Sequence, residues 1–352
     1  MESAREVTEQ ILAAARCIEA GRRAEAEALC RQILAATPRD PDVLAGLAAL
    51  ARRSGLRGLA VALADLAAGC APASAELHDL LGQVLNEAGD YKASVRAFER
   101  VLTLDPAYPA GADHLTRARH DLAIAQDPDY ASVPDAPWSA ADSIWEELAG
   151  NRTLLVLFAG LGVGAAPPTF IFRKFLASRT GVDKLFVRDT TRSWYQLGLP
   201  GVTGDVASTA AYLRQRRAAY DRTLFLGCSA GGMAAMLYGE LAGADRVLAF
   251  APQTVLSERK PHDLHDHRWE PALTRLRASV ADGRFLDLPG LGPLASAVDI
   301  YYPVESTADR THAEAVAGPR VRRFPQPGAS HVIALEMRDD GRLKSVVDAA
   351  LA

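Results

Sequence analysis

Cysteine is scarce in this sequence and follows no metal-binding spacing. Only four cysteines occur among the 352 residues, at Cys17, Cys30, Cys70 and Cys228. Zinc sites need closely spaced pairs of ligands, and these four cysteines are scattered. Cys17 and Cys30 lie at helical positions, where a free cysteine packs as a small apolar residue. We therefore expect no zinc site and a reducing, cytoplasmic environment.

Long apolar runs and a strong excess of one charge are also missing. The longest apolar run, near residues 154–168, is too short and too rich in glycine to span a bilayer. The acidic start of the sequence does not resemble a signal peptide. A net charge of −4 gives no reason to expect a nucleic-acid partner. With 352 residues, two globular domains are expected, and nothing indicates a cofactor or a membrane span.

Glycine and proline recur with one spacing in the first third of the sequence. Both residue types return every 34 residues, at Gly21, Gly55 and Gly89 and at Pro38, Pro72 and Pro106. Each unit is expected to form two helices, with the glycine in the turn between them and the proline after the second. The clearest copy includes Leu81-Gly82, Gly89-Asp90-Tyr91 and Ala97-Phe98. This pattern resembles the tetratricopeptide repeat (TPR).

The repeats predict an all-α solenoid over residues 1–126. Three repeats cover about 7–40, 41–74 and 75–108, and a capping helix follows from Gly111 to Gln126. The concave face of such an array suits a protein or peptide partner. Alternatively, the repeats only support the neighbouring domain or mediate dimerisation. Residues 127–150 contain three prolines and are predicted to be a linker.

A serine between two glycines ends an apolar segment later in the sequence. The segment at 223–226 runs into Gly227-Cys228-Ser229-Ala230-Gly231, and a helix of small residues follows. The first glycine allows the backbone to turn sharply, and the second lets the helix approach the strand. Such a turn exposes the serine hydroxyl at the positive end of the helix. Ser229 is therefore the predicted nucleophile.

Short apolar segments alternate with helical patterns over the last two-thirds of the sequence. The predicted strands are 153–159, 184–188, 223–226, 246–250, 298–302 and 320–324. The predicted helices are 169–178, 205–219, 230–241, 310–317 and 344–351. This alternation favours a mostly parallel, doubly wound sheet with helices on both faces. Together with the turn at Ser229, residues 151–352 resemble the α/β-hydrolase superfamily, whose catalytic order is serine, acid, histidine.

The resemblance implies a general base and an acid after the later strands. His331 follows the last predicted strand, where the family has its catalytic histidine, although an isolated loop histidine can also be only a solvent-exposed side chain. Asp309 is the predicted acid, with Glu305 as the alternative. Asp309 could instead serve only as the N-cap of the following helix. Asp299 is disfavoured because it begins its strand, at the wrong edge of the sheet.

The resemblance also implies an oxyanion hole and pocket residues. The backbone N–H groups of Ala230 and Leu161 are the predicted oxyanion donors. Gly160, Cys228 and Gln253 are predicted to contact the substrate. Where family members carry a His-Gly turn, this sequence has Phe158-Ala159-Gly160, which still supplies the backbone donor.

An aromatic loop follows the second predicted strand. Arg192, Trp194 and Tyr195 lie beyond the carboxyl end of that strand and could bind an acidic or sugar-like group. Alternatively, Asp189 and an arginine simply hold this loop in place. The sequence leaves both interpretations open.

The segment 257–294 is an insertion at the position where α/β-hydrolases carry a cap. Its helical part, at 268–280, is predicted to cover the active site and to select the substrate. The run His262-Asp263-Leu264-His265-Asp266-His267 resembles a set of metal ligands. Such a run on a polar loop is usually solvated surface, so we expect no metal there.

These residues predict a serine hydrolase that cleaves an ester or a thioester through an acyl-enzyme. The amino-acid sequence of the domain also resembles hydrolase modules of bacterial surface-polysaccharide loci. This resemblance makes an O-acylated carbohydrate a candidate substrate. An acyltransferase would use the same three residues. In a different class, the protein is a scaffold whose repeats recruit a partner and whose hydrolase domain is idle. The presence of serine, acid and histidine in the family's order argues against that alternative.

Overall fold

The chain divides into two compact units. The computed structural model describes residues 9–11, 13, 14, 16, 17, 22–36, 39–53, 56–109, 111–126, 139, 141–162, 170–258, 264, 266, 268–281 and 283–352. Within these residues, a helical unit ends at Ala125 and a second unit extends from Gln126 to Ala352. The predicted order, helices first and then an α/β unit, is confirmed.

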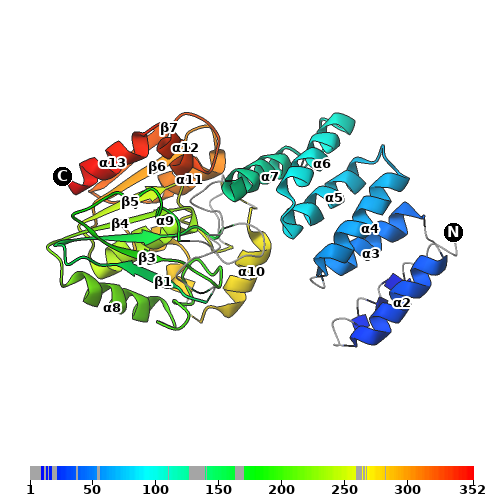
Figure 1. The fold of residues 1–352 in the computed structure, drawn as a ribbon, viewed down its shortest axis with the longest axis horizontal. Helices are drawn as coiled ribbons and strands as arrows, with labels where there is room; N and C mark the ends of the chain where they lie inside the picture. Colours follow the sequence, from blue (N-terminus) through cyan, green and yellow to red (C-terminus); the bar gives the residue numbers. More distant parts are fainter. Residues whose placement is uncertain are drawn as a thin grey trace. The chain divides into compact units, whose positions relative to one another are not determined.

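The first unit is a series of paired helices (Figure 1). The helices are α2 (Arg23–Ala36), α3 (Pro41–Arg53), α4 (Arg57–Cys70), α5 (Ala75–Ala88), α6 (Tyr91–Leu104) and α7 (Gly111–Gln126). Helices α2, α4 and α6 begin at intervals of 34 residues, and α3 and α5 begin with the same interval. This is the period of the predicted repeat, so the helical unit is a TPR-type array.

The glycines of the best repeat have clear structural roles. Gly89 has a φ of 91° and ends α5 in the left-handed conformation that glycine adopts readily. A Cβ atom on Gly82 would lie 2.6 Å from the ring of Phe98, so α5 and α6 can approach this closely only with glycine there. The Ser94 hydroxyl donates a hydrogen bond to the Gly82 carbonyl oxygen at 2.8 Å. Pro72 and Pro106 lie in the turns after α4 and α6, as predicted, and Gly21, Pro38 and Gly55 lie outside the described residues.

The second unit is built on a seven-stranded sheet. Its strands are β1 (Ile144–Glu147), β2 (Thr153–Phe158), β3 (Asp183–Val187), β4 (Arg222–Cys228), β5 (Arg246–Phe250), β6 (Val298–Pro303) and β7 (Val321–Gln326). Their order across the sheet is β1-β3-β2-β4-β5-β6-β7, and only the pair β1-β3 is antiparallel. The inner strands are nearly continuous runs of buried residues, as expected when both faces are covered.

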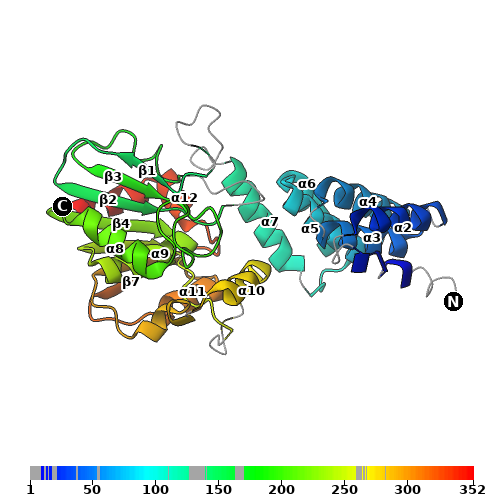
Figure 2. The same ribbon diagram turned by 90° about the horizontal axis from the view of Figure 1, so that it is seen from below.

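Helices cover both faces of this sheet. The helices of this unit are α8 (Val206–Arg217), α9 (Ala230–Ala242), α10 (Glu270–Ser279), α11 (Thr307–Ala315), α12 (Ile333–Asp339) and α13 (Arg342–Leu351), with short 3-10 helices η1 (Gly283–Phe285) and η2 (Leu288–Leu291). Helices α8 and α9 contribute to one apolar core and α12 and α13 to the other, on opposite faces (Figure 2). In the described part of the chain, no helix combines the length and the apolar character needed to cross a bilayer.

Strand β1 corrects the predicted linker of residues 127–150. Ile144–Glu147 pairs antiparallel with β3, and Trp145 lies opposite Phe186. Glutamate is disfavoured in strands, so the sequence of this segment did not indicate one. At the edge of a sheet, charge is tolerated, and here Glu147 pairs with Arg173 at 2.9 Å. Residues 127–138 lie outside the described part.

Residues 171–178 form turns rather than the helix predicted at 169–178. Phe172 has a φ of 66°, in the left-handed region that interrupts a right-handed helix. The Leu176 N–H donates a hydrogen bond to the carbonyl oxygen of Phe172, four residues earlier, as in an α-helix. The next hydrogen bond, from the Ala177 N–H to the Lys174 carbonyl oxygen, spans only three residues, as in a turn. Most other predicted elements differ from the observed ones by a few residues at their ends, and α12 was not predicted.

Candidate active site

Ser229 lies in a sharp, strained turn between β4 and α9. Its φ and ψ are 55° and −123°, a combination that residues with a Cβ rarely adopt. A Cβ atom on Gly227 would lie 2.1 Å from the Gly231 carbonyl oxygen, and one on Gly231 would lie 2.2 Å from the Phe158 carbonyl oxygen. Both glycines are therefore needed for α9 to begin this close to β2 and β4.

Ser229, His331 and Asp309 form one hydrogen-bonded chain. The Ser229 Oγ atom lies 2.8 Å from His331 Nε2, and His331 Nδ1 lies 2.7 Å from Asp309 Oδ1. The three residues come from the turn after β4, the first turn of α11 after β6, and the loop after β7. These segments meet because the carboxyl ends of parallel strands lie at the same edge of a sheet.

The other candidate acids have different partners. Glu305 accepts a hydrogen bond from the Gly328 N–H at 3.3 Å. Asp299 pairs with one arginine from each neighbouring strand, near the amino end of β6. Asp309 is not the N-cap of α11, because Ser306 holds that position and accepts a hydrogen bond from the Asp309 N–H. Of the acids considered, only Asp309 contacts His331.

Asp309 is fully buried and remains ionised. Burial by itself would raise the pKa of this carboxyl group, but His331 and Arg268 outweigh burial and hold the pKa of Asp309 below its ordinary value. The Ser306 hydroxyl adds a hydrogen bond at 2.8 Å. An ionised carboxylate only accepts, so His331 Nδ1 carries the proton and Nε2 is left to accept the Ser229 hydroxyl proton.

Strand order and this turn together characterise the second unit. A mostly parallel sheet carries a serine turn after its central strand, an acid after β6 and a histidine after β7. The second unit has the α/β-hydrolase fold.

Comparison with protein-family models gave no match, and no curated protein matched the chain. Among solved structures, the Sgt2 TPR domain from Aspergillus fumigatus is 23% identical and covers 37% of this chain and 90% of its own, with a TM-score of 0.31. Thermogutta terrifontis esterase 2, phosphonylated by sarin, is 22% identical over 60% of this chain and 84% of its own, with a TM-score of 0.40. A structure from the metagenome-derived lipolytic enzymes LipS and LipT is 12% identical over 60% and 98%, with a TM-score of 0.40.

One predicted oxyanion donor, Ala230, follows Ser229 in the chain, the other, Leu161, follows Gly160, and both residues are buried. Ala230 and Leu161 are 0% and 2% exposed, and neither N–H donates a hydrogen bond to any described residue. Gly160 brings the loop after β2 close to Ser229, because a Cβ atom there would lie 3.7 Å from Ser229 Cβ and 3.4 Å from the Cys228 carbonyl oxygen. N–H groups with no acceptor among the described residues suit a developing oxyanion, and this role stays a prediction.

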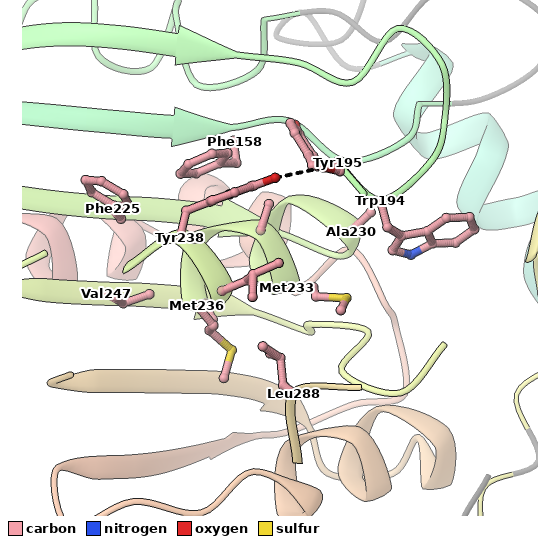
Figure 3. Close-up of a cluster of buried hydrophobic side chains, with 14 of the residues drawn as sticks. Phe158, Trp194, Tyr195, Phe225, Ala230, Met233, Met236, Tyr238, Val247 and Leu288 are labelled. Atoms are coloured by element: carbon pink, nitrogen blue, oxygen red, sulfur yellow. Dashed lines mark hydrogen bonds between the residues drawn. The ribbon is translucent and has the colours of Figure 1, made fainter. Parts of the chain in front are cut away.

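Trp194 and Tyr195 belong to the apolar core, which corrects their predicted role in substrate binding. Both side chains are 0% exposed, and Figure 3 shows them among other core residues. The Tyr195 hydroxyl donates to the Ala159 carbonyl oxygen at 2.7 Å, and the Tyr238 hydroxyl donates to the Tyr195 carbonyl oxygen at 2.7 Å. The Trp194 Nε1–H donates to Gln253 at 3.0 Å. Because the polar atoms of Trp194 and Tyr195 form hydrogen bonds inside the protein, both side chains stabilise the core.

Asp189 anchors this loop through backbone amides rather than through an arginine. Its carboxylate accepts hydrogen bonds from the N–H groups of Thr191, Ser193 and Tyr195. The loop needs such an anchor because Arg192 and Tyr195 have φ values of 55° and 62°, in the left-handed region. Arg192 is only half-buried, and its contact with a substrate stays a prediction.

Gln253 contacts Ser229 and is itself buried. Its Oε1 atom accepts the hydrogen bond from Trp194 and lies 3.4 Å from the Ser229 Oγ atom. Its Nε2 atom lies 3.5 Å from Asp266 Oδ2. Gln253 is 2% exposed, so its side chain packs against Ser229 within the protein interior.

Three polar residues that were not predicted as site residues lie next to the chain of Ser229, His331 and Asp309. Arg268 Nη2 donates to Asp309 at 2.9 Å and to Asp266 at 2.7 Å, and His312 Nε2 lies 3.1 Å from Asp266. Asp266 and Arg268 belong to the predicted cap insertion, and the only signal was the place of Asp266 in the possible metal-binding run. The other polar members of that run, His262, Asp263, His265 and His267, lie outside the described residues. Within the described part, no group of histidine, cysteine and acidic residues is arranged to hold a metal.

Proposed function

We propose that this protein is a serine hydrolase that cleaves an ester or a thioester. The observation that carries the proposal is the continuous chain of hydrogen bonds from Ser229 through His331 to Asp309. Its distances of 2.8 and 2.7 Å suit proton transfer without any rearrangement of the protein. The strained turn at Ser229 and the α/β-hydrolase fold support the same conclusion.

In the proposed mechanism, the Ser229 oxygen attacks the carbonyl carbon while His331 Nε2 takes the hydroxyl proton. The negative charge of the tetrahedral intermediate develops on the former carbonyl oxygen, where the N–H groups of Ala230 and Leu161 would stabilise it. Asp309 stabilises the imidazolium, which then gives its proton to the leaving alcohol or thiol. Water attacks the resulting acyl-Ser229 ester by the same sequence of steps, releasing the acid and restoring the serine.

Esters and thioesters are preferred over amides because their leaving groups depart more easily. An O-acylated carbohydrate is a candidate within the ester class. An acyltransferase would differ only in the second step, where an acceptor alcohol would replace water. We propose that the insertion 257–294 governs that choice and selects the substrate, because two of its residues reach the triad acid or its neighbours.

We propose that the TPR-type repeats recruit a protein or peptide partner. Stacked helix pairs present an extended concave surface, which is how such arrays bind extended segments. The alternative, a scaffold whose hydrolase domain is inactive, does not explain why Ser229 and His331 lie in hydrogen-bonding contact.

A fluorophosphonate probe tests the proposed nucleophile directly. Wild-type protein should be labelled at one serine, and Ser229→Ala should not be labelled. With a short-chain nitrophenyl ester, Ser229→Ala and His331→Ala should each lower kcat by a factor on the order of 10⁴ or more, because the triad acts as a unit. Circular dichroism spectra that match the wild type would show that the fold is intact.

Labelling of Ser229→Ala, or near-normal turnover by His331→Ala, would contradict the assigned roles. An unlabelled wild type would favour the scaffold. If the enzyme is active, product analysis with added alcohol separates hydrolysis from acyl transfer, since only a transferase forms the new ester in preference to the free acid.

A further inference from the structure

Arg268 lies between two buried carboxylates. Its Nη2 atom donates to Asp309 Oδ1 at 2.9 Å and to Asp266 Oδ2 at 2.7 Å, and its Nε atom donates to Asp266 Oδ1 at 2.9 Å. The side chains of Asp309 and Asp266 are 0% and 7% exposed. A planar guanidinium can serve two carboxylates at once, which a single ammonium group does less well.

His312 borders this cluster as a neutral imidazole. The backbone N–H of Thr254 donates to His312 Nδ1 at 3.1 Å, so that nitrogen carries no proton. Nε2 then carries the proton and donates to Asp266 Oδ2. Among the described residues, the charged groups that meet Arg268 are therefore Asp266 and Asp309. Those that meet Asp309 are Arg268 and, once protonated, His331.

We propose that Arg268 is a positioning residue of the triad, which orients Asp309 toward His331 and weakens the attraction of that carboxylate for the imidazolium. This inference rests on the proposed hydrolase function. Arg268 donates no hydrogen bond to Ser229 or His331 within the described structure, so it acts through Asp309. The insertion thereby takes part in catalysis through Arg268.

The physical consequence is a base that remains neutral at lower pH. When His331 takes the Ser229 proton, the new positive charge is attracted by Asp309 and repelled by Arg268. Loss of the Arg268 charge would favour the imidazolium, so a higher pH would be needed to keep His331 neutral. Loss of the Asp266 charge would have the opposite effect, because Arg268 would then act on Asp309 alone without compensation.

The experiment measures the rate of fluorophosphonate labelling of Ser229 against pH in the whole chain. The wild type should show a fall in rate toward acid pH as His331 becomes protonated. In Arg268→Met the midpoint of this fall should move up by about one pH unit, and in Asp266→Asn it should move down by about half a unit. Arg268→Lys keeps the charge and should keep the midpoint within about 0.3 unit, while labelling slows because one ammonium group cannot hold both carboxylates.

A matched control is Arg277→Met. Arg277 is another arginine of the insertion, but it donates to the Leu256 carbonyl oxygen at 2.7 Å and pairs with Glu270, away from the triad. This variant should keep the wild-type midpoint. A purely structural role of Arg268 would lower the rate at every pH without moving the midpoint.

Coincident midpoints in folded Arg268→Met, Asp266→Asn and wild type would overturn the proposal. If Arg268→Met does not fold, Asp266→Asn and Arg268→Lys decide the question. The proposal then requires a lower pH midpoint in Asp266→Asn and an unchanged midpoint in Arg268→Lys, and any other pair of results overturns it. A wild type that is not labelled at any pH contradicts the proposed hydrolase itself, and this inference with it. The two failures are therefore distinguishable.

Discussion

At the scale of the residue, the backbone around Ser229 matters as much as its hydroxyl. A non-glycine residue at φ 55° costs on the order of 1–3 kcal/mol, which the surrounding contacts must offset. The offset comes from close backbone packing, since Gly227 and Gly231 leave no room for a side chain. As a result, the Ser229 hydroxyl oxygen lies next to the N-terminus of α9 and forms a hydrogen bond with His331.

Gly231→Ala should therefore damage both stability and activity. The added Cβ would lie 2.2 Å from the Phe158 carbonyl oxygen and 2.6 Å from that of Ala159, so backbone atoms must move. Overpacking of this kind should lower the free energy of unfolding by about 1–3 kcal/mol or more, and the rate of fluorophosphonate labelling should fall at least tenfold. Urea unfolding and labelling kinetics measure the two effects.

The control for this prediction is Gly204→Ala. Gly204 is exposed, and a Cβ there would meet no atom within 4 Å. This variant should keep wild-type stability and labelling. Equal behaviour of the two variants would mean that the turn tolerates a side chain and is not closely packed.

At the scale of the element, helix ends explain why the repeat helices begin where they do. Helix α5 starts after Ser74 and α6 after Asp90, and each of these side chains accepts a hydrogen bond from a backbone N–H in the first turn. Such caps satisfy donors that have no partner inside the helix. Short polar residues therefore fix the helix boundaries, while the apolar face fixes how the helices pack.

Asp90→Ala should destabilise the repeat unit through loss of the cap. Asp90 Oδ1 accepts from the Ala93 N–H at 3.0 Å, and removing a cap of this kind costs about 1 kcal/mol. The matched control is Asp65→Ala, because Asp65 is exposed in the middle of α4 and has no hydrogen bond or ion pair with the described residues. Thermal unfolding followed by circular dichroism should show a lower midpoint for Asp90→Ala only. A midpoint equal to that of the control would count against the cap.

At the scale of the molecule, the two compact units have separate apolar cores. Among the described residues, the clusters of the helical unit contain no residue of the sheet unit, and the two clusters of the sheet unit contain none from the repeats. Cores that share no residues are expected to unfold as separate cooperative units. The chain should therefore behave as two domains in calorimetry.

Gly82→Ala tests this independence. Its Cβ would lie 2.6 Å from the Phe98 ring, so the transition of the helical unit should move to lower temperature by several degrees, at about 4–8 °C per kcal/mol for a unit of this size. The transition of the α/β-hydrolase unit should stay in place. Gly69→Ala, where a Cβ would meet no atom within 4 Å, is the control. A shift of both transitions together would show that the units unfold as one.

Much of the organisation follows from the sequence alone, because it depends on local backbone chemistry. Glycine and proline at a 34-residue interval predict the helix pairs, and alternating apolar segments predict the parallel sheet, and both are confirmed. The glycines around Ser229 predict the sharp turn for the same reason, since few other residues permit it. The candidate residues Asp309 and His331 were chosen by their place after particular strands, and their catalytic roles stay a prediction.

Only the tertiary structure decided the features that depend on distant partners. Ile144–Glu147 becomes a strand because β3 offers an edge, and Trp194 and Tyr195 turn inward because their polar atoms find acceptors in the core. Asp266 looks like a solvated loop residue in the sequence, yet it is buried and bound to Arg268, which in turn binds Asp309, 41 residues further along the chain. Burial of a charge is favourable only beside its counter-charge, and no local pattern reveals which distant residue will supply it.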